Sequence, residues 1–324
     1  MVGLFDFFWL FSVIRAQISA FNTPVVFCMF LNFALKIVAL DAVSIHDDPI
    51  HGMHSEELMT HLKAGHRAYA TAILTASPLW PPLVAKTGVD FVFIDTEHIA
   101  LDRESLSWMC RTYEALGLAP LVRIASPDPV LACQTLDGGA MGIVAPYVET
   151  AEQTRALVGA VKWRPLKGQR LESFLDGKQA LEPELLQYLT HRNRKHWLLV
   201  NIESQPAIEN LDSILQVPGL DGVLIGPHDL SCSLGIPEQY DHPRFEAAVI
   251  DILSRARKHH LIAGNHFCED LDLHARWAKH GENLIIRSND LYLFSRALRN
   301  DLNRMRHLLD EPTMPENPGE SLVI

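Results

Sequence analysis

The chain has 324 residues with a formal net charge of −11 at pH 7, and hydrophobic residues make up 48% of it. This apolar fraction excludes an intrinsically disordered chain, and the acidic balance argues against a nucleic-acid-binding protein, which needs a basic surface. The length suits two ordinary domains, or one barrel of about 250 residues with an extension. The 5 cysteines are scattered and include no Cys-x-x-Cys pair, which argues against a disulfide framework and favours the cytoplasm.

The first part of the chain, residues 1–40, is strongly apolar, and its charged residues are Asp6, Arg15 and Lys36. Its longest apolar run, residues 25–40, is shorter than the roughly 20 residues that span a bilayer. Asp6 stands where a secretory signal carries basic residues. Three interpretations stay open: a membrane anchor, a targeting segment that is retained, and sequence outside the folded protein, which we favour. We place an extension with a polar linker at residues 1–54 and the folded domain at 55–324.

In the folded domain, short β-branched runs alternate with amphipathic stretches. The predicted strands are Tyr69–Thr75, Phe91–Asp95, Pro120–Ile124, Gly142–Pro146, Trp197–Ile202, Gly222–Gly226, Leu261–Gly264 and Asn283–Arg287. The predicted helices include Arg103–Leu116, Thr150–Val161, Ala207–Gln216, Pro243–His259 and Leu291–Leu309. Helix-start residues precede three of them, namely Asp102, Thr150, and Asp241 followed by Pro243.

The alternation predicts a (β/α)₈ barrel. Strands that are apolar through most of their length indicate a parallel sheet buried on both faces, and eight such repeats favour closure. An open doubly wound sheet is the alternative, but no Gly-x-Gly-x-x-Gly motif follows the first strand. The connection at residues 162–196 is unusually long, so we expect a functional insertion with its own helix near Pro183–Leu189.

Polar residues gather where the predicted strands end, which is where barrel enzymes carry their active sites. These residues are Asp95, Glu97, His98, Arg123, Glu203, Gly226, Pro227, His228 and Asp229. Glu203 and Asp229 follow neighbouring strands, and two carboxylates suit a hard cation such as Mg²⁺ or Mn²⁺. An arginine at a barrel mouth suits a small carboxylate or enolate, and a histidine there suits proton transfer.

Each of these residues also has a purely structural interpretation. His98 can be a hydrogen-bonded buried histidine, and Arg123 can be paired with Asp95 or Glu97. Glu203 can cap a helix beginning near Pro206, and Asp229 can cap the turn that follows it. Because all of them fall at neighbouring strand ends, we favour a common site.

Five segments carry a resemblance that runs from about Ser55 to near the C-terminus: FVFIDTEHIALD, PLVRI, APYVETAEQTRALV, VNIESQPAIENLDSIL and LDGVLIGPHDLSCSLG. Together they resemble the HpcH/HpaI aldolase family. The resemblance implies a barrel of the phosphoenolpyruvate/pyruvate type and a class II, metal-dependent pyruvate aldolase. Such an enzyme cleaves 2-oxo-4-hydroxy acids through a pyruvate enolate, with Mg²⁺, Mn²⁺ or Co²⁺. The alternatives are an oxaloacetate decarboxylase or macrophomate synthase-like enzyme that uses the same enolate, and an inactive barrel that binds a metal or metabolite.

The resemblance also assigns roles. It places the metal ligands on Glu203 and Asp229, the contact to the 2-oxo group on Arg123, and the acid/base on His98 with Asp137 as its carboxylate partner. The turn of Gly226, Pro227, His228 and Asp229 would bind the substrate carboxylate through its amides. No lysine stands at a strand end to form a Schiff base.

Departures from the family concern the second substrate. His228 replaces a small residue, Gly168–Leu171 lacks the second glycine of a Gly-x-Arg-Gly element, and the first strand has no tryptophan. We therefore expect an intact metal and pyruvate end and an altered aldehyde pocket. The expected partners are a 2-oxo acid, an aldehyde and further copies of the chain, because the family commonly swaps its amphipathic C-terminal helix. No nucleic-acid partner is expected, and membrane association depends on residues 1–40.

Overall fold

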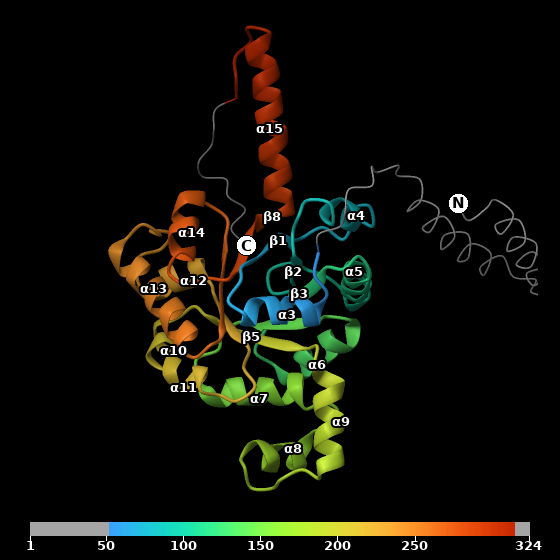
Figure 1. Cartoon of the computed structure of the whole chain (residues 1–324). Helices are drawn as coiled ribbons and strands as arrows, with labels where there is room; N and C mark the ends of the chain where they lie inside the picture. Colours follow the sequence, from blue (N-terminus) through green and yellow to red (C-terminus); the bar gives the residue numbers. More distant parts are fainter. Residues whose placement is uncertain (1–51, 315–324) are drawn as a thin grey trace, which may run out of the picture. The chain divides into compact units, whose positions relative to one another are not determined.

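Eight parallel strands close into a barrel in the order in which they occur along the chain (Figure 1). The computed structural model describes residues 52–314, so most of the predicted extension and linker lies outside the described residues. The strands are β1 (Ala68–Ile73), β2 (Phe91–Asp95), β3 (Ala119–Arg123), β4 (Gly142–Ala145), β5 (Trp197–Ile202), β6 (Gly222–Ile225), β7 (Ile262–Phe267) and β8 (Leu284–Asn289). The predicted (β/α)₈ fold is confirmed.

Helices connect the strands and surround them. They are α3 (Ser55–Lys63), α4 (Trp80–Val84), α5 (Arg103–Ala115), α6 (Pro129–Gly138), α7 (Ala151–Lys162), α8 (Gly168–Leu175), α9 (Pro183–Asn193), α10 (Gln205–Glu209), α11 (Leu211–Leu215), α12 (Pro227–Ser233), α13 (Pro243–Lys258), α14 (Leu271–Ala278) and α15 (Asp290–Leu308). The long connection between β4 and β5 contains α8 and α9 after α7. Within residues 52–314, no helix is both long and apolar enough to cross a membrane.

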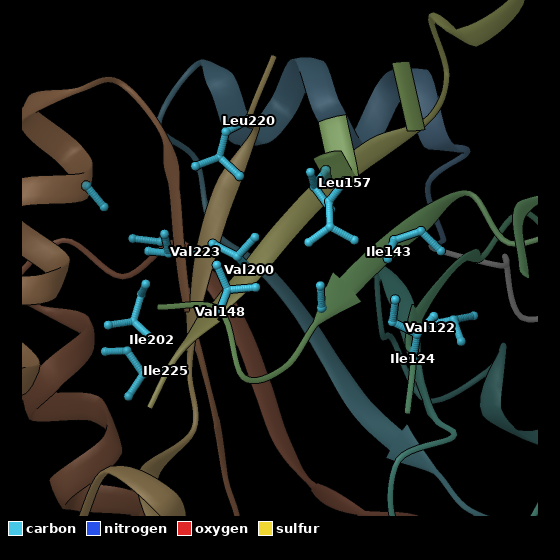
Figure 2. Close-up of a cluster of buried hydrophobic side chains, with 14 of the residues drawn as sticks. Val122, Ile124, Ile143, Val148, Leu157, Val200, Ile202, Leu220, Val223 and Ile225 are labelled. Atoms are coloured by element: carbon cyan, nitrogen blue, oxygen red, sulfur yellow. The ribbon is translucent and has the colours of Figure 1, made fainter. Parts of the chain in front are cut away.

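The strands alternate their side chains between two hydrophobic clusters, as parallel strands buried on both faces do. In β2, Phe91 and Phe93 belong to the cluster inside the barrel, whereas Val92 and Ile94 belong to the cluster between barrel and helices. Figure 2 shows part of the outer cluster, in which strand residues such as Val200 lie near Leu157 of helix α7. The same alternation directs Asp95, at the end of β2, toward the barrel axis.

Helix α3 covers the amino end of the barrel. Leu58 and Leu62 are fully buried in the interior cluster, and the Asn283 side chain donates a hydrogen bond to the Leu62 carbonyl at 2.9 Å. Met53, which the sequence placed in the linker, hydrogen-bonds through its backbone to Asp90 and Ala119. Helix α3 thus covers the end of the barrel opposite to the polar strand ends.

Some element boundaries differ from the predicted ones. Strand β7 continues past Gly264 to Phe267, so Asn265 and His266 belong to the strand. The predicted helix Ala207–Gln216 is divided into α10 and α11, which meet at Asn210. Asp102 and Thr150 cap their helices as predicted, but His242 rather than Asp241 caps α13.

Candidate active site

Arg123 is the centre of a buried ion-pair cluster at the barrel mouth. Its Nε lies 2.8 Å from Asp95 Oδ1, and its Nη2 lies 2.8 Å from Asp95 Oδ2. The same Nε is 3.1 Å from Glu97 Oε2, and the arginine side chain is only 7% exposed. Burial raises the pKa of Asp95, but the hydrogen bonds and charge of Arg123 outweigh this effect, so the pKa lies below its usual value. Arg123 is thus held in one orientation by two carboxylates.

Glu203 is a buried carboxylate with hydrogen bonds to both oxygens. Oε1 accepts from the backbone N–H of Tyr147 at 2.7 Å, and Oε2 accepts from the Asn201 side chain at 2.7 Å. Burial raises its pKa to about 7, and the charge of Asp229 contributes in the same direction. The cap of α10 is Ser204 and not Glu203, so the helix-capping interpretation of Glu203 is wrong.

Asp229 lies in the first turn of α12, directly after β6. The N-cap position of this helix is Gly226, and no side chain caps it, so Asp229 is not an N-cap either. The carboxylates of Glu203 and Asp229 are close enough for their charges to interact. Among residues 52–314, no group of three or more His, Cys, Asp or Glu side chains is arranged to hold a metal. A cation here would therefore rest on two protein carboxylates and on oxygens from substrate or water.

Gly226 leaves the space that Glu203 occupies. A Cβ atom at this position would lie 2.5 Å from Glu203 Oε2 and 3.0 Å from Glu203 Cβ. We expect Gly226→Ala to displace the Glu203 carboxylate and to weaken Mn²⁺ binding by about tenfold or more, as changes to residues that orient ligands commonly do. Calorimetric titration with Mn²⁺ measures this effect. Gly138→Ala, a change at the last residue of α6 where a Cβ atom would make only ordinary contacts, serves as a control for glycine substitution. Equal Mn²⁺ affinity in Gly226→Ala and the unmodified protein would contradict the assignment.

His98 stands at the rim of the mouth, and its partner there is Glu97. His98 Nε2 lies 3.7 Å from Glu97 Oε2, and the histidine side chain is 38% exposed. The backbone N–H of Glu97 donates to Asp95 Oδ1 at 3.0 Å, which ties this loop to the Arg123 cluster. The structure therefore brings His98 into the same group of residues as Arg123.

Asp137 is not brought to this group. It lies in the last turn of α6, which leads into the amino end of β4 and so ends at the opposite face of the barrel. Its side chain is 72% exposed and accepts a hydrogen bond from Arg164 at 2.8 Å. Within one copy of the chain, Asp137 is thus paired with Arg164 and not with His98.

The mouth also contains a pocket between the ends of β3, β5, β6 and β7. Its lining includes Arg123, Asn201, Gly226, Pro227, His228, Asp229 and His266. The His228 ring reaches toward Glu238, with 3.7 Å between Nδ1 and Oε1. The turn that the sequence assigned to the substrate carboxylate therefore shares one cavity with Arg123.

Sequence reasoning missed three residues of the mouth. Asn201 orients Glu203, and its position on β5, two residues before Glu203, was a usable signal. Tyr147 has a left-handed backbone, with φ of 55°, and its N–H binds Glu203. A hydrogen bond between its phenol and Glu97 raises the pKa of Tyr147 to about 12. The third residue, His266, lies on β7 beyond Gly264, where the predicted strand ended.

The described site is a cluster of carboxylates, one arginine and histidines at the carboxyl ends of the strands of a barrel, as in many barrel enzymes. A family profile described as HpcH/HpaI aldolase/citrate lyase matches residues 75–297. The 2-keto-3-deoxy-L-rhamnonate aldolase of Salmonella gallinarum is 34% identical over 216 residues, 67% of this chain and 80% of the relative. The chain belongs to the HpcH/HpaI aldolase/citrate lyase family, and it is a carbon–carbon lyase of the aldolase type.

Solved structures agree with this membership. Citrate synthase SbnG superposes with a TM-score of 0.67 and 31% identity, covering 78% of this chain and 99% of that one. The HpcH/HpaI aldolase from Desulfitobacterium hafniense superposes with a TM-score of 0.67 and 26% identity, covering 80% and 99%. The resemblance found in the sequence is confirmed.

Proposed function

We propose that the chain is a class II pyruvate aldolase that cleaves 2-oxo-4-hydroxy acids to pyruvate and an aldehyde with the help of a divalent cation. The observation that carries this proposal is that Arg123 lines one pocket with Asp229, while Glu203 lies close enough for its charge to interact with both. An arginine fixed at this place can bind the 2-oxo oxygen and stabilise negative charge that develops on it.

The donor set suits a divalent cation. Burial and the charge of Asp229 both disfavour the charged form of Glu203 and raise its pKa, and a bound cation would offset the burial of this carboxylate and its repulsion from Asp229. Carboxylate oxygens favour Mg²⁺ or Mn²⁺, with Co²⁺ as a further candidate. When bound, the cation supplies Lewis-acid stabilisation of the enolate oxygen.

The remaining residues have separate tasks. The turn from Gly226 to Asp229 binds the substrate carboxylate, since it shares the pocket with Arg123. In the cleavage direction His98 takes the proton from the C4 hydroxyl, and the C3–C4 bond then breaks to release the aldehyde. Glu97 contacts His98 and Arg123, and it couples the orientation of the two side chains.

Asp137 is proposed to orient His98 only from a second copy of the chain, because it lies at the opposite end of its own barrel. An assembly of this kind agrees with α15, in which Asp290 is the only buried residue. In Figure 1 this helix extends away from the barrel. A stripe of exposed apolar side chains runs along it, formed by Leu291, Phe294, Leu298, Leu302, Met305 and Leu309. We propose a homo-oligomer in which this stripe packs against another copy.

The barrel offers a matching surface. A groove outside β1 and β8 is lined by Tyr69, Leu271, Ala275 and Ile285, and Tyr69 is 50% exposed. We expect Leu298→Asp to break the assembly, because it places a charge in the apolar stripe. Light scattering should show a lower molar mass for this variant, whereas Asn300→Asp, on another face of α15, should leave the mass unchanged. An unchanged mass for Leu298→Asp would refute the interface.

The proposed function is tested with purified protein, a 2-oxo-4-hydroxy acid and oxaloacetate, each with Mn²⁺ or with EDTA. We expect His98→Asn to lower aldol cleavage by about 100-fold, the usual contribution of one acid/base group. Oxaloacetate decarboxylation has no hydroxyl proton to remove, so His98→Asn should lower it much less. Decarboxylation without any aldol cleavage in the unmodified protein would favour the decarboxylase alternative. Mn²⁺ binding without either reaction would favour the inactive barrel.

A further inference from the structure

A pocket near the amino ends of β4 and β5 takes no part in the proposed reaction. Met141, which precedes β4, and His196, which precedes β5, both line it, so it lies toward the face of the barrel opposite to the mouth. Its volume is about 480 Å³. The charged residues of its lining are Arg111, Glu114, Asp137, Arg164, Arg192 and Lys195. Four of these six side chains are cationic, whereas the chain as a whole carries a formal net charge of −11.

Arg164 and His196 form the buried part of this pocket. Arg164 Nη1 lies 2.8 Å from Asp137 Oδ1, and its Nη2 lies 3.1 Å from His196 Nε2. The arginine side chain is only 12% exposed. Burial first, and then the charges of Arg164 and Lys195, lower the pKa of His196 to about 3, so its ring is neutral at physiological pH. A guanidinium only donates, so the neutral ring accepts from Arg164 and holds it in place.

The backbone that carries these cations is fixed on both sides of the pocket. The buried Asn193 side chain donates hydrogen bonds to the Arg164 carbonyl at 2.8 Å and to the Leu189 carbonyl at 2.9 Å. The Ser55 hydroxyl donates to the Lys195 carbonyl at 2.5 Å. The pocket is therefore formed before any ligand arrives, which lowers the entropy lost on binding.

Three of the four cations lack a carboxylate partner. Asp137 pairs with Arg164, but within residues 52–314 no ion pair forms at Arg111, Arg192 or Lys195. Arg111 and Arg192 donate instead to neutral oxygens, the Asp137 carbonyl at 3.3 Å and the Tyr188 hydroxyl at 3.5 Å. Burial lowers the pKa of Arg164, and the charge of Arg192 acts in the same direction. Like charges held this close repel one another, and a bound anion would relieve the repulsion.

We propose that this pocket binds a phosphate group, either as free phosphate or as part of a small phosphate ester. Guanidinium groups donate to phosphate oxygens in pairs, and such charge-assisted hydrogen bonds are the strong ones. The terminal oxygens of a phosphate point in several directions, so they can accept from Arg164 and from the unpaired cations together. A single carboxylate has two oxygens in one plane and would reach fewer of these donors.

Calorimetric titration of the full-length protein tests this proposal, with inorganic phosphate and with glycerol 3-phosphate as the two probes. The buffer contains no divalent cation, so that phosphate is not held by a metal at the mouth. We expect Lys195→Glu to weaken the binding of both probes by about tenfold or more, the fold-change of one charge-assisted hydrogen bond. Arg192→Gln should weaken it in the same way without reversing a charge. Lys258→Glu, the same change at an exposed lysine that ends α13, is the matched control and should leave both Kd values unchanged.

The outcomes separate the two sources of phosphate. Tighter binding of glycerol 3-phosphate assigns the pocket to a phosphate ester, and tighter binding of inorganic phosphate assigns it to the free ion; either result supports the proposal. Equal Kd values in Lys195→Glu and Lys258→Glu overturn it, as does the absence of phosphate binding to the unmodified protein. Thermal unfolding shows that each variant is folded. Because the readout is phosphate binding away from the mouth, this proposal can fail while the aldolase proposal holds, and the reverse.

Discussion

Replacing Glu203 by glutamine, or Asp229 by asparagine, is expected to lower kcat/KM for aldol cleavage with Mn²⁺ by about 1,000-fold, or about 4 kcal/mol of transition-state stabilisation. Each change removes one of the two carboxylates on which the cation rests, but it keeps the size of the side chain. Steady-state kinetics at saturating Mn²⁺ measure the loss. Glu209→Gln, an exposed change on the helix that follows Glu203, is the control. Full activity in Glu203→Gln would refute the cation site.

The same site should bind its cation with a characteristic pH dependence. Burial raises the pKa of Glu203 to about 7, so below this pH a proton competes with the cation for the carboxylate. Affinity for Mn²⁺ is therefore expected to fall as the pH decreases below 7, by up to about tenfold per pH unit. Titrations at several pH values measure the slope. An affinity for Mn²⁺ that stays the same between a pH of about 5.5 and a pH of about 7 would contradict this expectation.

Replacing Arg123 by methionine is expected to remove activity and to destabilise the protein together. The substitution leaves Asp95 and Glu97 buried without their cation, and breaking a buried ion pair in this way costs about 3–5 kcal/mol. Urea unfolding measures the stability, and kinetics measure the activity. Arg123→Lys should be better folded, but it loses the paired contacts of Nε and Nη2 to Asp95 and should remain about 100-fold less active.

A double variant separates the two roles of Arg123. Adding Asp95→Asn to Arg123→Met removes one unpaired charge, so stability should partly return whereas activity should not.

The pH dependence of stability follows from Asp95, whose pKa lies below its usual value when Arg123 is present. Its contribution to stability is present above a pH of about 4 and is lost as the pH falls through the lower, folded-state pKa. In the single variant Arg123→Met, the unpaired Asp95 carboxylate becomes protonated as the pH falls. The difference in stability between this variant and the unmodified protein should therefore shrink at acidic pH. Recovery of activity in the double variant would show that Arg123 is only structural.

The sequence predicted the barrel and much of the mouth because both follow from local patterns. Apolar runs recur at the spacing of strands and helices, and each strand buries both faces. Polar side chains at strand ends then meet at one face, because parallel strands all end there. Arg123, Glu203 and Asp229 were identified in this way, and the structure places them together at the mouth.

The tertiary structure decided the partners of these residues. Asp137 matched the family motif, yet its helix carries it to the opposite end of the barrel, because a helix between parallel strands runs back to their amino ends. His266 was missed because Asn265 and His266 interrupt the apolar run of β7, and only the closed barrel shows that His266 faces Arg123's pocket. Tyr147 acquires its contact to Glu203 through a left-handed backbone that no periodicity encodes. The sequence alone determined which strands carry polar ends, since hydrophobic patterning is local. Which polar groups touch depends on strand order, register and strained turns, and these arise only when the barrel closes.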